Sequence, residues 1–194
     1  MEKSEQIEQA RKLLIRRAVA YDVVNLTKML IQAREEKGQH IYYPSVPEGE
    51  VGRQMVSDHV RDMTKNGVIY VADLDGRLLG AIGMHVTQMA EWSFDFGLIN
   101  AWFYVLPQFR DSDIAISLLK AVEKWADADI NPWNDKAKPR MPMIVGMMSG
   151  QQTGLKNKFM QSLGYVNGGG NFVRSPHHEQ FIEDDDNGRD SRVA

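Results

Sequence analysis

The chain has 194 residues, of which 43% are apolar and 25% are charged, and it carries a formal net charge of −3. This length fits one domain with tails, and a body of this size buries about 70% of the surface of its unfolded chain. The sequence contains no cysteine, which excludes a disulfide framework, a thiol nucleophile and cysteine-ligated metal centres. No apolar run approaches the ~18 residues of a membrane span and the first residues are polar, so we expect a cytoplasmic protein without a signal peptide.

The charge is distributed unevenly along the chain. Residues 176–194 carry six acids and two arginines, a charge of −4, which leaves +1 for the rest. We therefore predict a polar extension over residues 1–12, a folded domain over residues 13–175 and an acidic, disordered tail over residues 176–194. Because a near-neutral body lacks a basic face for phosphate contacts, a nucleic-acid partner is disfavoured.

The first part of the domain is predicted to form a strand and two helices. Leu13–Ile15 is a short apolar run, and Asp22 is expected to cap the helix that follows it. Residues 39–52 contain two prolines and two glycines, which predicts a loop between the helices. Apolar side chains at helical spacing mark the helices themselves: Val23, Leu26 and Leu30 in the first, then Val56, Val60 and Met63 in the second, which ends near Asn66 and Gly67.

Two strands follow, over residues 68–72 and 78–86. The dipeptide Asp75–Gly76 between them is typical of a two-residue hairpin turn. A further strand is predicted over Ala101–Leu106, where Pro107 stops it. The first helices, the hairpin and this strand together indicate an α/β domain with a mixed sheet.

The last third of the domain is predicted as helix, strand, helix and hairpin. Residues 113–128 place Ile114, Leu118, Val122 and Ala126 on one helical face. After an irregular, proline-containing connection, Met143–Met148 has the composition of a buried strand. A final helical stripe closes at Gly164, and residues 165–166 and 172–173 are expected to pair as a hairpin. The stripe consists of Leu155, Phe159 and Leu163.

The turn between the strand that ends at Val105 and the helix from Ile114 is a candidate binding site. Backbone amides at a helix N-terminus, together with the positive end of the helix dipole, favour an anion. The residues between Pro107 and the helix, Gln108-Phe109-Arg110-Asp111-Ser112-Asp113, include side chains that also cap helices without binding any ligand.

Several pieces in order resemble the GNAT superfamily of N-acetyltransferases over most of residues 13–175. Ile15-Arg16-Arg17-Ala18 is similar to the first strand of that family, and residues 67–72 with 79–83 to its second and third strands. Val105-x-Pro107-x-Phe109-Arg110 is similar to the segment that leads into its pyrophosphate loop, and Leu163-Gly164-Tyr165 to the end of its last helix.

The resemblance implies a splayed sheet flanked by helices, with acetyl-CoA between the fourth and fifth strands, here Ala101–Val105 and Met143–Met148. It implies direct attack on the thioester by a primary amine of a small molecule or a protein, without a covalent enzyme intermediate and without a metal. The oligomeric state stays open, with a homodimer as one option. The residues implied in cofactor binding are Phe103, Val105, Arg110, Asp111, Ser112, Asp113, Ile114 and Ala115.

The sequence departs from the family pattern at several places. Asp113 stands where the loop has its central glycine, Asp111 where a glycine often follows the arginine, and Met160 where the family has a tyrosine acid. The predicted fourth strand has no carboxylate, so the candidates for acid or base are Glu91, Asp95, His85 and Tyr104. Tyr42 and Tyr43 lie at the sequence position where, in that family, residues form the wall of the acceptor pocket.

Two functions follow. The first is an acetyl-CoA-dependent N-acetyltransferase acting on a primary amine. The alternative is a catalytically inactive protein of the same fold that serves as a binding or structural module.

Overall fold

A computed structural model describes residues 13–36, 49–88, 91–92, 96–128, 141–145 and 153–166, the last range without the side chains of residues 153–157. The predicted terminal extensions, Tyr42, Tyr43, Asp95 and the second half of the expected final hairpin lie outside these residues. The chain divides into two compact units, residues 1–33 with 47–146 and residues 34–46 with 147–194. All five strands lie in the first unit.

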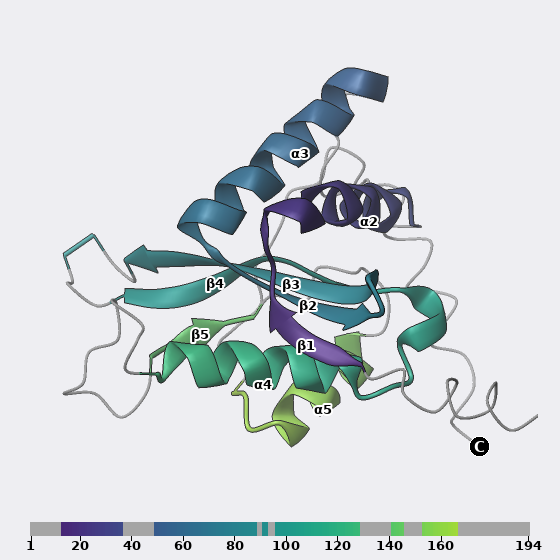
Figure 1. Cartoon of the computed structure of the whole chain (residues 1–194). Helices are drawn as coiled ribbons and strands as arrows, with labels where there is room; N and C mark the ends of the chain where they lie inside the picture. The colour runs from purple at the N-terminus through teal and green to yellow at the C-terminus, as the bar shows by residue number, and fades with distance from the viewer. Residues whose placement is uncertain are drawn as a thin grey trace, which may run out of the picture. The chain divides into compact units, whose positions relative to one another are not determined.

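The sheet of the first unit has five strands in the order β1-β2-β3-β4-β5 (Figure 1). Neighbouring strands pair antiparallel up to β4, and β4 pairs parallel with β5, so the expected mixed sheet is confirmed. The strands are β1 (Leu14–Arg17), β2 (Val68–Leu74), β3 (Arg77–Gln88), β4 (Phe96–Val105) and β5 (Met143–Ile144).

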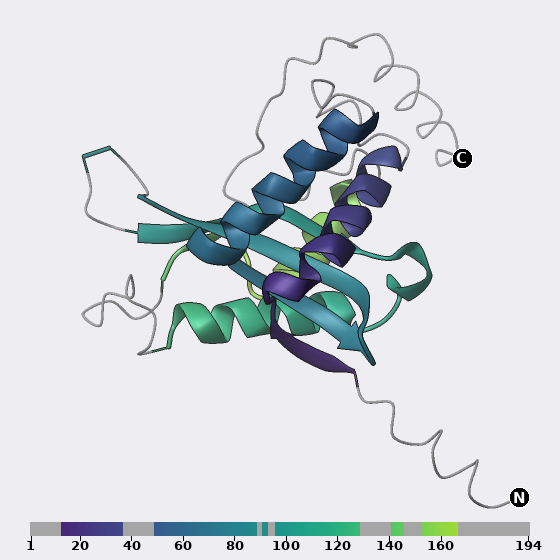
Figure 2. The same ribbon diagram turned by 45° about the horizontal axis from the view of Figure 1, so that its top comes forward.

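Helices cover both faces of this sheet. In Figures 1 and 2, α2 and α3 lie on one face and α4 lies on the other. The predicted apolar face of α4 is confirmed, because Ile114, Leu118, Val122 and Ala126 are all buried. The helices are η1 (Ala20–Asp22), α2 (Val23–Glu35), α3 (Gly49–Asn66), η2 (Pro107–Phe109), α4 (Ile114–Ala126) and, in the second unit, α5 (Thr153–Ser162).

The hairpin between β2 and β3 forms as predicted. Asp75 and Gly76 both have positive φ angles, +53° and +84°, as a type I′ turn requires. Its two strands pair from Val68 with Met84 to Leu74 with Arg77, with a bulge beside Ala72. The Asp–Gly dipeptide therefore sets the register of the two central strands.

Two boundaries and the burial of one strand differ from the sequence prediction. The loop expected up to Gly52 ends earlier, since α3 begins at Gly49, itself at a positive φ of +74°. The fourth strand begins at Phe96 and not at Ala101, because antiparallel pairing to β3 continues through polar and glycine positions. The fifth strand is not buried where it is described: Met143 is half-buried and Ile144 is 47% exposed.

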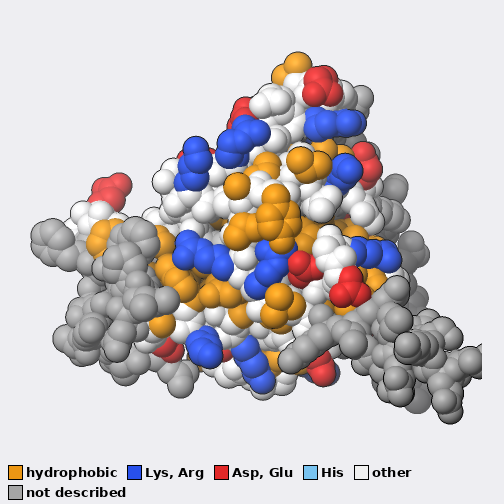
Figure 3. Space-filling model, in the orientation of Figure 1, with side chains coloured by type: hydrophobic (Ala, Val, Ile, Leu, Met, Phe, Trp, Pro, Cys, Tyr) orange, Lys and Arg blue, Asp and Glu red, His pale blue; other side chains and the backbone are white. Residues whose placement is uncertain are grey.

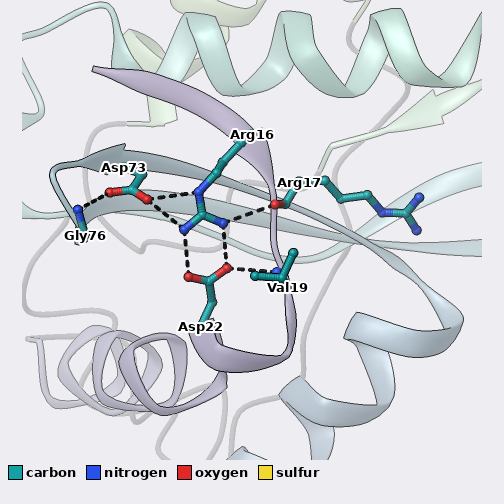
Figure 4. A network of polar contacts seen from close by, with 6 residues as sticks. All are labelled: Arg16, Arg17, Val19, Asp22, Asp73 and Gly76. Atoms are coloured by element: carbon teal, nitrogen blue, oxygen red, sulfur yellow. Dashed lines mark hydrogen bonds and ion pairs between the residues drawn. The ribbon is translucent and has the colours of Figure 1, made fainter. Parts of the chain in front are cut away.

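An ion network ties β1 to the start of α2 and to the β2–β3 hairpin (Figure 4). The guanidinium of Arg16 donates to both oxygens of Asp22 at 2.7 and 2.8 Å, and twice to Oδ2 of Asp73 at 2.9 and 2.7 Å. Asp22 Oδ2 also accepts from the amide of Val19, and Asp73 Oδ1 from the amide of Gly76. Side chains of Asp22, Asp73 and Arg16 are 1%, 11% and 18% exposed, so this network is largely withdrawn from water.

The role predicted for Asp22 changes accordingly. It was expected to cap the following helix with its side chain. Asp22 is instead the last residue of η1, and its carboxylate accepts hydrogen bonds from the amide of Val19 and from Arg16. Burial opposes ionisation of Asp22, but the hydrogen bonds from Arg16 and Val19 outweigh it and hold the pKa of this carboxyl below its ordinary value.

The end of α5 is stabilised by a glycine in the left-handed conformation. Gly164 has a φ of +87°, its amide donates to the carbonyl of Gln161, and the amide of Tyr165 donates to the carbonyl of Met160. This pattern is a Schellman motif, and it confirms the predicted cap at Gly164. Tyr165 therefore closes the helix, and the structure assigns no strand to residues 165–166.

Replacing Gly164 by alanine should lower the free energy of unfolding by about 1 kcal/mol, because a Cβ is strained at this φ. Urea denaturation measures the change. Gly164→Asn is the matched control and should cost less, since asparagine tolerates the left-handed region better than alanine. Equal losses in the two variants would contradict this explanation.

Candidate functional site

The candidate site begins where β4 leaves the sheet. The strand passes through Leu106 into the short helix η2, and Arg110 is the C-cap residue of η2. Asp111, Ser112 and Asp113 are exposed, and the chain then enters α4 at the buried Ile114. The predicted strand–turn–helix is thus confirmed, with one helical turn inserted in it.

The first turn of α4 is capped by a serine. Ser112 Oγ donates to the carbonyl of Phe109 at 2.6 Å and accepts from the amide of Ile114 at 3.4 Å. Asp113 stands at the N-cap position, but its side chain makes no capping hydrogen bond. Only its backbone carbonyl takes part, accepting from the amide of Ser117 at 2.9 Å. The carboxylate of Asp113 therefore does not cap the amides at the start of α4.

Arg110 lies back against the end of β4. Its Nε donates to the carbonyl of Val105 at 3.1 Å, and its guanidinium carbon is 5.4 Å from the centre of the Tyr104 ring. These contacts hold the guanidinium against the end of β4, beside the turn. Tyr104 is only 8% exposed and belongs to the core between the sheet and the helices α2 and α3.

The edge of β4 that faces β5 changes character along its length. Leu98 and Ile99 pair with β5, and the amide of Leu98 also donates to the carbonyl of Pro142. Gly83 pairs with Trp102 and Met84 with Asn100, so a bulge leaves Ala101 as the extra residue. Within the described ranges, Ala101–Val105 have no partner in β5, and this stretch includes the predicted cofactor residues Phe103 and Val105.

The remaining acid and base candidates are placed apart from one another. His85 is exposed on β3, and its ring meets that of His59 from α3 edge to face, with centres 5.9 Å apart. Burial and, next, the nearby His85 lower the pKa of His59, while Asp62 opposes them. Glu91 is exposed, and Met160 is half-buried on α5 in the second unit.

Sequence reasoning missed two residues here, His59 and Trp102. His59 has no sequence signal, because it lies on the polar side of an amphipathic helix. Trp102 could have been singled out as the one indole on a predicted strand, but only the register reveals that it lies opposite a glycine. Among the described residues, no cluster of three or more His, Asp or Glu side chains could hold a metal ion, and no helix is long and apolar enough to span a membrane.

Solved structures identify this arrangement of strands and helices. A possible acetyltransferase from Clostridium difficile 630 aligns with 84% of this chain and 95% of its own, at a TM-score of 0.60 and 16% identity. AAC(6')-Iy in complex with a bisubstrate analog, CoA-S-monomethyl-acetylneamine, aligns with 84% and 97%, at a TM-score of 0.59 and 15% identity. An aminoglycoside acetyltransferase from an uncultured soil metagenomic sample aligns with 84% and 93%, at a TM-score of 0.55 and 17% identity. The chain has the GNAT acetyltransferase fold.

This assignment comes from structure, since no protein-family model and no curated protein matches the sequence. The GNAT fold predicted from the ordered motifs is confirmed, including the mixed sheet and its flanking helices. On the face drawn in Figure 3, basic side chains are interspersed with acidic and apolar ones.

Proposed function

We propose that this protein is an N-acetyltransferase that transfers an acetyl group from acetyl-CoA to a primary amine by direct attack. The observation that carries the proposal is the stretch Ala101–Val105 of β4, which has no β5 partner among the described residues and leads directly into the N-terminus of α4 within a GNAT fold. The CoA moiety of the bisubstrate analog held by AAC(6')-Iy supports the same cofactor class for this chain.

The residues present fit such a cofactor. The backbone groups of Phe103 and the amide of Val105, which face away from β3, would form hydrogen bonds along a pantetheine arm, as an added strand does, while the carbonyl of Val105 accepts from Arg110. The amides of Ile114 and Ala115 at the helix start would hold the pyrophosphate. The long 3.4 Å hydrogen bond from Ile114 to Ser112 leaves this amide weakly engaged. Bound acetyl-CoA would supply the acyl group as a reactive thioester.

The remaining work of the protein is to orient and deprotonate the amine. Holding the amine against the thioester carbonyl supplies a large part of the rate in such a transfer. Asp95, Tyr104, His85 and Glu91 remain the candidates for the group that moves the proton, directly or through water, and Tyr42 and Tyr43 for the acceptor wall. The acceptor is a small-molecule or protein amine.

Adding acetyl-CoA at a hundred times its dissociation constant should stabilise the protein by about 2.7 kcal/mol and raise its melting temperature by about 5 °C. Differential scanning fluorimetry with increasing acetyl-CoA measures this, and adenosine diphosphate is the matched control for the nucleotide part alone. No shift at saturating acetyl-CoA would overturn the proposal. Binding without release of free CoA in the presence of any primary amine would favour the inactive alternative.

A further inference from the structure

A small polar cluster lies on the sheet face that α2 and α3 cover. It consists of His59 on α3, His85 on β3 and Trp102 on β4, all in the first unit. The proposed reaction as described so far uses His85 only as one of several candidates for proton transfer, and it uses neither His59 nor Trp102. Trp102 is the most unusual of the three.

The indole of Trp102 lies flat against Gly83. A Cβ placed on Gly83 would lie 2.4 Å from Cε2 and 2.9 Å from Nε1 of that indole, so only glycine allows this packing. Nε1 is buried, and it has no hydrogen-bond partner. An unpaired buried donor costs about 1–3 kcal/mol, and a group of this kind in a folded protein calls for an explanation.

The two histidines lie on the same face of the sheet as this donor. His85 is on the same face of β3 as Gly83 and two residues further on, a spacing of roughly 7 Å. His59 meets His85 from the helix above at 5.9 Å between ring centres, and both rings are exposed. Each of the three side chains offers an N–H donor, and a second positive charge on the histidine pair is disfavoured unless an anion is close.

The cluster also lies beside the stretch Ala101–Val105 of β4. Ile99, the partner of His85, is the last residue of β4 that pairs with β5 in the described part of the chain, and Trp102 belongs to the stretch that follows it. A ligand atom over β3 is therefore one or two strand spacings, about 5–10 Å, from the edge where the amine must react. The indole as a whole is half-buried but its Nε1 is buried, so a ligand contacts the N–H only after neighbouring side chains move.

We propose that His59, His85 and Trp102 bind an anionic oxygen of the acceptor, so that the preferred substrates are primary amines that carry a carboxylate or a phosphate a few bonds away. The inference rests on the proposed acetyl transfer and deepens it by naming the acceptor class. It assigns His85 to binding, and not to proton transfer.

Four small amines of similar length test the acceptor class: β-alanine with a carboxylate, O-phosphoethanolamine with a phosphate, neutral ethanolamine and cationic 1,3-diaminopropane. With acetyl-CoA saturating, kcat/KM for one of the acidic amines should exceed that for ethanolamine at least tenfold. Which acidic amine is better distinguishes the carboxylate from the phosphate. A preference for ethanolamine or the diamine would overturn the inference.

Two variants test the residues. Trp102→Phe keeps a ring but removes the donor, and His85→Gln changes an exposed position that should not affect folding. Each should lower kcat/KM for the acidic amine about five- to twentyfold more than it lowers kcat/KM for ethanolamine. Trp125→Phe, which removes a buried indole on the opposite face, is the matched control and should leave the ratio unchanged. A uniform loss for all amines would mean that Trp102 and His85 are only structural.

A binding measurement separates this inference from the proposed function. The indole N–H resonance of Trp102, assigned by its loss in Trp102→Phe, should shift when β-alanine or O-phosphoethanolamine is titrated, and not with ethanolamine. A shift without any acetyl transfer would keep the anion site and overturn the proposed activity. Acetyl transfer without a shift would keep the activity and overturn the anion site.

Discussion

Replacing Arg16 by methionine should lower the free energy of unfolding by about 3–5 kcal/mol, the loss expected when one member of a buried ion network is removed. In Figure 4 the guanidinium of Arg16 donates to both Asp22 and Asp73, whereas Arg17 takes part only through its backbone carbonyl. Without Arg16, two largely buried carboxylates would face each other with only the amides of Val19 and Gly76 as donors. Chemical denaturation of both proteins measures the difference.

The matched control is Arg61→Met. Arg61 forms an ion pair with Asp58 on α3, but both side chains are more than half exposed, so its loss should cost less than about 1 kcal/mol. If Arg16→Met is too unstable to purify, Arg16→Lys keeps the charge but loses the fork that reaches both carboxylates, and a smaller loss is expected. Similar small losses for Arg16→Met and Arg61→Met would show that burial adds nothing to this network.

The same network predicts how stability depends on pH. Because the pKa of Asp22 is lower in the folded chain than in the unfolded chain, its contribution is fully present above the unfolded value near 4. It is lost as the pH falls through the lower, folded value. The difference between the wild type and Asp22→Asn should therefore be constant from about pH 5 to pH 7 and shrink below about pH 4. A difference that stays constant down to pH 2 would contradict this.

Local signals in the sequence were sufficient for most of the fold. Asp75–Gly76 sets a turn that only a few residue pairs adopt, and the apolar spacing of α4 leaves one face to bury. The ends of strands were predicted wrongly where hydrogen bonding to a neighbouring strand decides them. Phe96 belongs to β4 because β3 is long enough to pair with it. The sequence of β4 by itself does not reveal how long β3 is.

The candidate site was predictable only in part. The turn after β4 could be found because a proline, a basic residue and a helix start follow one another in sequence. The cluster of His59, His85 and Trp102 could not, since three elements meet there and only the register places Trp102 opposite Gly83. Asp113 shows a third case. Its residue type favours capping, but the side chain that accepts from the amide of Ile114 is that of Ser112, which also donates to the carbonyl of Phe109.

Replacing Asp113 by glycine should tighten the binding of acetyl-CoA by about three- to thirtyfold. A carboxylate about 5 Å from a pyrophosphate at an effective dielectric of about 20 is repelled by roughly 3 kcal/mol, and Arg110 beside the turn offsets part of this. The gain should come without a large loss of stability, because the Asp113 side chain makes no capping hydrogen bond in the folded chain. Calorimetric titration of both proteins with acetyl-CoA measures the change.

Asp113→Asn separates the two reasons why a glycine would help. It removes the charge but keeps the side chain, so it should give most of the gain if repulsion dominates and little if the Cβ and its substituents obstruct the phosphates. Raising the salt concentration from 0.05 to 0.5 M should shrink a gain that comes from charge and leave a steric gain unchanged. Unchanged or weaker binding in both variants would mean that the carboxylate points away from the pyrophosphate. Binding of acetyl-CoA by the glycine variant alone would mean that the natural chain keeps the GNAT fold with a loop that rejects the cofactor, and that outcome would favour the inactive alternative over the transferase.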